Sequence, residues 1–225
     1  MIKFHDLRVP LVEGVYDPNI FKAFFLAGGP GSGKSYVVRR TTGGTGLKVV
    51  NSDDAFESLL KKAGLSLKMP PEETERRDIV RGRAKALTSK RQTNYLDGRL
   101  GLIIDGTGRQ SGKILRQKAS LEELGYDTYM IFVNTSMDVA LQRNEERARS
   151  LPTSFVIKSW KDVQANIGAF NNMFRQGFIV VDNNDAGEDV FKSVWKRIQG
   201  MLRKKVSNTR ATNWIAMELE KKRRK

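Results

Sequence analysis

The sequence predicts an α/β fold in which helices flank a five-stranded parallel sheet. Short apolar runs alternate with longer segments of helical character, which is the pattern expected when crossover helices join parallel strands. Each apolar run ends in polar residues or glycine. Because ligands of open parallel sheets bind at the carboxyl ends of the strands, candidate functional residues are expected at those positions.

The elements follow from this alternation. Strands are expected at residues 21–27, 47–51, 100–104, 128–133 and 178–181. Helices are expected at 34–41, 54–63, 72–96, 111–124, 136–150, 154–175 and 186–204. The prolines at 70 and 71 precede two glutamates, a typical helix start, since proline fits the first turn and acids favour the positive end of the helix dipole. Pro152 should end the helix before it, which makes residues 150–153 a candidate lid boundary.

A complete phosphate-binding motif joins the first strand to the first helix. Residues 28–35 are Gly-Gly-Pro-Gly-Ser-Gly-Lys-Ser, which matches G-x-x-x-x-G-K-[ST] at every fixed position. The glycines allow successive backbone amides to surround phosphate oxygens at a helix N-terminus, while Lys34 reaches the β- and γ-phosphates and Ser35 holds Mg²⁺. The residues expected to contact the nucleotide are Gly28, Gly29, Pro30, Gly31, Ser32, Gly33, Lys34, Ser35, Tyr36 and Arg143.

Length and composition limit the remaining possibilities. The chain has 225 residues, enough for one substantial core, and its lack of cysteine excludes disulfides and thiolate chemistry. Neither a long apolar run nor a secretory leader is apparent, so a cytoplasmic protein without membrane contact is expected. We expect an N-terminal extension at residues 1–20, a phosphate-loop kinase domain at 21–205 and a basic C-terminal tail at 206–225.

The net charge of +15 is unevenly distributed. Residues 201–225 contain nine Lys and Arg against two Glu, which puts +7 in the tail and +8 in the other 200 residues. A basic segment of this kind is typical of an arm that contacts nucleic acid or a partner. The alternative for residues 221–225 is a solvated, frayed terminus.

Acidic residues follow the second and third strands. Asp53 and Asp54 come directly after the second strand, where a carboxylate could accept the proton of an attacking hydroxyl or assist the metal. The alternative is helix capping, and one Asp could cap while the other acts in catalysis. Asp105 ends the third strand, where it could act on Mg²⁺ or on the substrate, with Thr107 and Arg109 on the same edge. The alternative there is a turn built from Asp and Gly.

Two further segments follow the fourth and fifth strands. Arg143 and Arg147 are four residues apart on an expected helix and would share one face, where they could bind phosphates. Pairing with neighbouring glutamates is the alternative. Residues 182–185, Asp-Asn-Asn-Asp, could border the adenine, but capping of the next helix is favoured.

In combination, these motifs resemble the family that joins the zeta toxins to the polynucleotide 5′-hydroxyl kinases. The resemblance rests on residues 28–35, 50–54 and 103–107 and on the two arginines, and it spans about residues 21–200. It implies a P-loop NTPase fold with strand order 2-3-1-4-5, Asp53 as general base, and contacts from Arg143 and Arg147 to ATP phosphates. Relatives commonly have an aromatic residue and then Arg after the Asp pair, whereas this chain has Ala55 and Phe56.

The sequence therefore predicts a kinase that uses ATP and Mg²⁺. The expected catalytic residues are Lys34, Asp53, Arg143 and Arg147; the expected substrate residues are Asp53, Asp54, Asp105, Thr107 and Arg109; and the expected metal ligands are Ser35, Asp53 and Asp105. The expected acceptor is a hydroxyl of a nucleotide, a nucleotide sugar or a nucleic-acid 5′ end. The alternatives are a nucleic-acid-binding protein that uses ATP as a ligand or switch, and a regulatory ATPase without an acceptor.

Overall fold

The computed structural model describes residues 14–68, 70–147 and 150–224. These residues form one parallel sheet in the order β2-β3-β1-β4-β5, which confirms the predicted fold class and strand order. The strands are β1 (Lys22–Ala27), β2 (Lys48–Val50), β3 (Leu102–Ile104), β4 (Asp127–Asn134) and β5 (Phe178–Asp182). With β1 central and buried throughout, the loop that follows it lies at the middle of the carboxyl edge.

Helices cover both faces of the sheet because successive side chains of β1 point to opposite sides. Phe25 and Ala27 pack in one core, to which α4 (Ser111–Glu123), α6 (Thr153–Ala165) and α7 (Ile167–Phe174) contribute. Phe24 and Leu26 pack in the other, with α1 (Lys34–Thr42) and α8 (Glu188–Arg203). The chain thus builds a three-layer sandwich in which α1 and α4 pack on opposite faces of the sheet.

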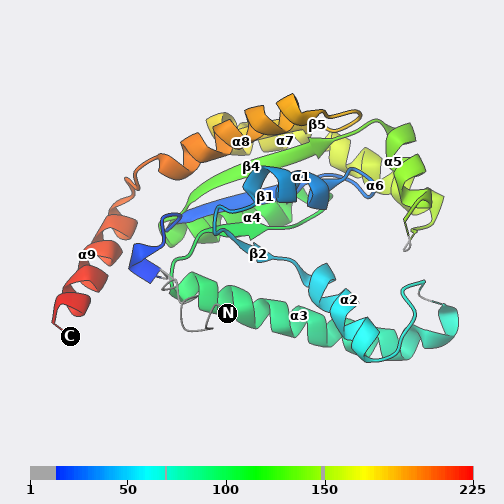
Figure 1. Cartoon of the computed structure of the whole chain (residues 1–225), viewed down its shortest axis with the longest axis horizontal. Helices are drawn as coiled ribbons and strands as arrows, with labels where there is room; N and C mark the ends of the chain where they lie inside the picture. The colour runs from blue at the N-terminus through cyan, green and yellow to red at the C-terminus, as the bar shows by residue number, and fades with distance from the viewer. Residues whose placement is uncertain (1–13, 69, 148–149, 225) are drawn as a thin grey trace, which may run out of the picture.

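The second and third helices form a smaller unit of their own. After α2 (Ser52–Lys62) comes a short 3₁₀ turn, η3 (Pro71–Glu73), and then the long α3 (Thr74–Asp97). Phe56 and Leu60 pack against Leu65 and Val80 in a separate small core. Figure 1 shows α2 and α3 running along each other, away from most of the sheet.

Two predicted helices differ from the structure. The helix expected at 136–150 is α5 (Met137–Glu145), which ends five residues early; residues 148 and 149 lie outside the described part. The helix expected at 154–175 is broken at Asn166 into α6 and α7. The Asn166 amide donates to the carbonyls of Gly108 and Arg109, at 3.0 Å each, so the break joins these helices to the loop after β3.

The C-terminal segment is also helical. In α9 (Thr209–Arg223), Ala211 is fully buried and Trp214 packs edge-on against Phe21, with ring centroids 5.5 Å apart. Lys222 lies over the ring of Tyr16, in the 3₁₀ turn η2 (Gly14–Tyr16). Residues 221–223 are therefore helical rather than frayed, while their side chains are exposed, as expected for a solvated terminus. Residue 225 and most of the expected N-terminal extension, residues 1–13, lie outside the described residues, and the division into three regions stays a prediction.

Figure 1 shows α9 at one end of the sheet and the α5–α6 pair at the other, beyond the carboxyl ends of β1 and β4. Across the described ranges, we find no helix that combines the length and the apolar character needed to cross a membrane.

Candidate active site

The loop at residues 28–35 joins β1 to α1 and is closely packed by neighbouring segments. Gly31 and Gly33 have φ values of 76° and 80°, which L side chains rarely adopt. A Cβ on Gly31 would lie 2.1 Å from the carbonyl oxygen of Ala140, and one on Gly33 would lie 2.4 Å from Nδ2 of Asn183. The glycines therefore satisfy two requirements at once, the backbone conformation and the close approach of α5 and of the loop after β5.

The ammonium group of Lys34 lies within the loop. Its Nζ donates to the carbonyl oxygen of Gly28 at 2.7 Å and to that of Gly29 at 3.3 Å. Burial lowers the pKa of Lys34, and the Asp105 carboxylate opposes that shift most strongly, with a smaller contribution from Asp53. The structure therefore brings the predicted phosphate-binding lysine and two predicted carboxylates within electrostatic range of one another.

Ser35, the predicted metal ligand in the loop, is exposed at the first turn of α1. It faces a cavity of about 370 Å³ that Asn51, Asp54 and Asp105 also line. Asp53 does not line this cavity; it lies on the exposed side of the first turn of α2. No group of three or more His, Cys, Asp or Glu in the described residues is arranged as a metal site formed by protein alone.

Asn51, and neither Asp53 nor Asp54, caps α2. Its Oδ1 accepts a hydrogen bond from the backbone amide of Asp53 at 2.8 Å. Its Nδ2 donates to Oδ2 of Asp105 at 3.0 Å and to Oδ1 of Asp54 at 3.3 Å. The capping alternative for Asp53 and Asp54 is therefore wrong. Both carboxylates lie in the first turn of α2 without a capping role.

Burial, together with repulsion among the acids, raises the pKa of two of them. Burial raises the pKa of Asp105, and the charges of Asp53 and Asp54 add to the rise, while Lys34 opposes it. Burial likewise raises the pKa of Asp54, with further contributions from Asp53 and Glu57. Such a cluster is stabilised by a cation, and carboxylate and hydroxyl oxygens are the ligands that Mg²⁺ prefers.

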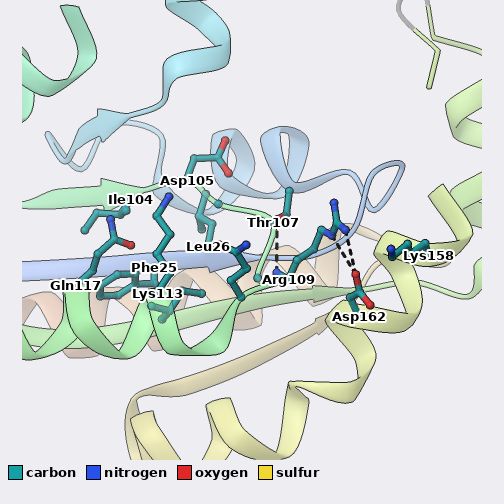
Figure 2. Close-up of a pocket in the computed structure, with 14 residues that line it drawn as sticks. Phe25, Leu26, Ile104, Asp105, Thr107, Arg109, Lys113, Gln117, Lys158 and Asp162 are labelled. Carbon is teal, nitrogen blue, oxygen red and sulfur yellow. Dashed lines mark hydrogen bonds and ion pairs between the residues drawn. The ribbon is translucent and has the colours of Figure 1, made fainter. Parts of the chain in front are cut away.

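The loop after β3 connects the phosphate loop to α6. The carbonyl oxygen of Thr107 accepts from the Gly28 amide at 3.0 Å. Nε and Nη2 of Arg109 donate to one oxygen of Asp162 at 3.2 and 3.1 Å (Figure 2). The Arg109 guanidinium also lies 5.0 Å from the ring centroid of Phe155. Arg109 is thus already paired with a residue of α6. The loop that begins with Asp105 and Gly106 also contacts the phosphate loop through Thr107.

The same loop borders a second cavity of about 490 Å³ on the α4 face of the sheet (Figure 2). Its lining residues are Phe25, Leu26, Ile104, Asp105, Gly106, Thr107, Gly108, Arg109, Gln110, Lys113, Ile114, Gln117, Lys158 and Asp162. Asp105 and Leu26 line both cavities, so the two hollows adjoin at the carboxyl edge of the sheet.

The two arginines do not share a helix face as predicted. Arg143 is on α5, and its Nη1 and Nη2 donate to the carbonyl oxygens of Asn183 and Asn184 at 2.7 and 3.0 Å. Because α5 ends at Glu145, Arg147 lies beyond the helix, exposed to solvent. The Arg147 guanidinium still contributes to lowering the pKa of Lys34, so both arginines remain near the phosphate loop.

Asn183 and Asn184 contact the phosphate loop and α5 rather than capping the next helix. Nδ2 of Asn183 donates to the carbonyl oxygen of Ser32 at 2.8 Å. The N-cap of α8 is Gly187, without a side-chain cap. The predicted capping role for residues 182–185 is therefore wrong. Tyr36, predicted to contact the nucleotide, is half exposed and packs edge-on against Phe191.

Fold and site together define a phosphate-loop protein of the kinase-like α/β type. The chain matches the family AAA_33, described as an AAA domain, over residues 24–169. That match covers more than half of its length, and the chain belongs to this family. None of the curated proteins compared with the chain matches it.

Solved structures share the architecture. A gluconokinase from Sinorhizobium meliloti 1021 is 13% identical with a TM-score of 0.52, over 82% of this chain and 95% of that chain. A chain in the structure of the Pnkp1/Rnl/Hen1 RNA repair complex is 23% identical with a TM-score of 0.51, over 68% of this chain and 47% of that one. At these identities the likeness shows the fold alone.

Proposed function

We propose that the protein is a kinase that uses ATP and Mg²⁺ to phosphorylate a hydroxyl of a nucleotide, a nucleotide sugar or a nucleic-acid 5′ end. One observation carries the proposal: the carboxylates of Asp54 and Asp105 line one cavity with Ser35 of the phosphate loop, and Asp53 lies in the first turn of the same helix as Asp54. A phosphoryl-transfer site needs such carboxylates to orient the acceptor and to hold the metal.

The nucleotide half consists of the loop amides, Lys34 and the two arginines. The amides and Lys34 bind the β- and γ-phosphates, while Arg143 and Arg147 offset negative charge during transfer. Ser35 and Asp105 face the same cavity and fit Mg²⁺ as oxygen ligands, with Asp53 close by. When bound, Mg²⁺ neutralises the phosphate oxygens and helps to align them.

The acceptor half uses Asp53 as general base. Its carboxylate takes the proton of the acceptor hydroxyl as that oxygen attacks the γ-phosphorus; the bond from the γ-phosphorus to the bridging oxygen breaks, and its electron pair leaves with ADP. Asp53 is exposed, so an acceptor can reach it from solvent. Asp54, Asp105, Thr107 and Arg109 are the proposed substrate residues at this edge.

The test is transfer from γ-labelled ATP to a panel of nucleosides, nucleotide sugars and 5′-hydroxyl oligonucleotides. Asp53→Asn should lower the transfer rate by about 10²- to 10⁴-fold, because it removes the proton acceptor. ATP affinity should stay close to that of the wild type. Glu57→Gln is the matched control: it removes a carboxylate charge one turn further along α2 and should leave transfer intact. Lys34→Ala supplies the blank.

Full transfer by Asp53→Asn with normal ATP binding would show that another group is the base. Phosphate release from ATP that no member of the panel changes would instead favour the regulatory ATPase.

The tail gives less support to a nucleic-acid-binding function than its composition suggests. Lys221 pairs with Glu218, Arg224 pairs with Glu220, and Lys222 lies over Tyr16. These contacts hold part of the basic run on the fold but leave its net charge of +7 unchanged, since that value already counts both glutamates. The tail lies at the end of the sheet away from the phosphate loop. We therefore retain the kinase as the proposed function.

A further inference from the structure

The exposed face of α8 is positively charged beyond the acidic first turn. Residues 190–205 contain six Lys and Arg and no Asp or Glu, so no carboxylate within this stretch offsets the charge. On the inner face, Phe191, Val194, Ile198 and Leu202 are buried in the core. Figure 1 shows α8 along the outer border of the molecule, and its residues line neither cavity of the candidate active site.

One aromatic side chain is exposed within this basic face. Lys192, Trp195, Lys196 and Arg203 are spaced by three, one and seven residues, which places them on one side of the helix over about 16 Å. All four are exposed, and Trp195 is 41% exposed. Lys196 and Arg203 have no hydrogen bond or ion pair with any residue in the described ranges. Lys192 pairs only at 3.7 Å, with the exposed Asp189.

Trp195 differs from the other two tryptophans of the chain. The indole of Trp160 donates to the Thr135 carbonyl, and Trp214 packs edge-on against Phe21. Trp195 makes neither a hydrogen bond nor a ring contact with any residue that the structure describes. The exposed part of its ring is therefore free to stack on a planar group of a ligand.

A second helix has a similar charge but exposes no ring. Residues 79–96 of α3 contain five Lys and Arg and no acid. The large apolar side chains that α3 exposes are aliphatic, Ile79 and Leu87. Charge alone attracts any polyanion, whereas cations beside a free ring match a ligand in which phosphates alternate with planar bases. This combination is present on α8 and not on α3.

From this combination we infer that α8 binds single-stranded nucleic acid, with a base stacked on Trp195 and phosphates on Lys192, Lys196 and Arg203. A single strand is required because its bases are free to stack on a side chain, whereas those of a duplex stack on one another. A membrane is a poor match, since the apolar face of α8 is buried in the core and cannot insert. The surface is separate from phosphoryl transfer and does not depend on the proposed kinase function.

The test measures binding of an oligonucleotide that cannot be the proposed acceptor. The probe is a labelled single strand of about 12 nucleotides, made as DNA and as RNA, whose 5′ end is already phosphorylated. It is titrated with the full chain, without ATP, at several salt concentrations. Fluorescence anisotropy gives Kd, and quenching of tryptophan fluorescence reports stacking on the indole. The matching duplex and polyglutamate are titrated in parallel.

Trp195→Leu should weaken binding of the single strand by about tenfold, as expected for one lost base stack. Trp195→Phe should retain most of the affinity but lose most of the quenching, a result that a purely structural role of the ring would not produce. Lys192→Gln combined with Lys196→Gln should lower the slope of log Kd against log salt by about 0.7 for each lost phosphate contact.

The matched control is Lys85→Gln combined with Lys90→Gln, which removes the same two charges from exposed positions of α3. Figure 1 shows α3 and α8 at opposite borders of the molecule. The control should change Kd by no more than about twofold, because charges far from the bound strand are screened.

Four results would each overturn the inference: no binding by the wild type, an equal loss in the α3 control, full quenching in Trp195→Phe, and binding of the duplex or of polyglutamate as tight as that of the single strand. The kinase is tested separately, by transfer to 5′-hydroxyl probes. Binding of the phosphorylated strand without any transfer would support the α8 surface and overturn the kinase. Transfer by a protein that does not bind that strand would do the reverse.

Discussion

The side-chain amide of Asn51 both accepts and donates hydrogen bonds, so this residue caps a helix and also holds a carboxylate of the candidate site. Its oxygen caps α2 and its nitrogen holds the Asp105 carboxylate, so the end of β2 is joined to the end of β3. Asn183 and Asn166 also join segments, but by donating alone: Nδ2 of the first donates to the Ser32 carbonyl, and Nδ2 of the second donates to two carbonyls of the loop after β3. An amide that donates and accepts at once can connect two segments without adding charge beside the phosphates.

Replacing Asn51 by Ala should cost about 1 kcal/mol of stability through the lost cap and should also reduce transfer, because Asp105 loses its donor. Asn208→Ala is the matched control, since Asn208 caps α9 through the Arg210 amide at 2.9 Å, at the opposite end of the sheet. Chemical denaturation and kcat measured on both variants test this. Equal activity in the two would mean that the Asn51–Asp105 contact has no role in the reaction.

Gly31→Ala should both destabilise the protein and abolish ATP binding. Its Cβ would meet the Ala140 backbone at 2.1 Å, and its φ of 76° is unfavourable for alanine. Gly44 has the same φ but nothing within 4 Å of its Cβ position. Gly44→Ala should therefore cost only the backbone term, about 1–2 kcal/mol, and should leave the ATP affinity unchanged. Calorimetric titration with ATP distinguishes the two, and normal ATP binding by Gly31→Ala would contradict this close packing of the loop on α5.

At the scale of elements, α6 and α9 show how helices outside the phosphate loop support it. On α6, Asp162 holds Arg109, and the backbone of Trp160 lies close to the phosphate loop, since a Cβ on Gly29 would be 3.6 Å from Trp160 Cα. The Trp160 indole donates to the Thr135 carbonyl at 2.8 Å. One helix thus touches both halves of the candidate site. On the other side, α9 packs against the start of β1, at the end of the sheet away from the site.

Docking of α9 predicts a structural role for this helix. Trp214→Ala should cost about 2–4 kcal/mol, because Trp214 packs against Phe21 and the guanidinium of Arg99. Met217→Ala on the same helix removes a side chain that is 58% exposed and should change stability by less than about 0.5 kcal/mol. Urea denaturation measures both. Similar stability of the two variants would show that α9 is a dispensable tail, as its composition alone suggests.

At the scale of the whole molecule, the carboxylates at the active edge oppose folding at neutral pH. The pKa of Asp105 is raised from its ordinary value of 3.8, mainly by burial. The stabilising contribution of its protonated form is complete below pH 3.8 and is lost as the pH rises through the raised pKa of the folded protein. Burial of the ionised Asp105 carboxylate, with a smaller contribution from the charges of Asp53 and Asp54, therefore destabilises the free protein at the place where a metal ion would bind.

Asp105→Asn should accordingly raise the melting temperature of the free protein at pH 7, and the gain should shrink as the pH falls toward about 4. Thermal unfolding followed by circular dichroism across this range measures the difference. Asp78→Asn, at an exposed position on α3, serves as the control and should give no such pH-dependent gain. A melting temperature of Asp105→Asn at or below that of the wild type at pH 7 would mean that the ionised Asp105 does not oppose folding.

Much of the fold could be predicted because its signals are local. The motif at 28–35 contains its own glycines and lysine, and the alternation of apolar runs with helical segments predicts parallel strands. The breaks in helices were harder to predict. No proline marks the break at Asn166, and the nearby Gly168 lies inside α7. The Asn166 side chain donates to partners 57 and 58 residues away in sequence, which a local pattern does not reveal. The cap of α2 was hard to predict for a different reason. Asn51 is followed by Ser52, Asp53 and Asp54, which are all residue types that commonly cap helices.

By itself, the sequence determined that this chain has an α/β fold with a phosphate loop at its centre, and that carboxylates follow the next two strands. Those features depend on residue type and on short spacing. Only the tertiary structure decided that Arg143 and Arg147 do not share a helix, that Arg109 is paired with Asp162, and that Trp195 is exposed beside the lysines of α8. Each of these features depends on contacts between residues that are far apart in the sequence, and local sequence patterns do not encode such long-range contacts.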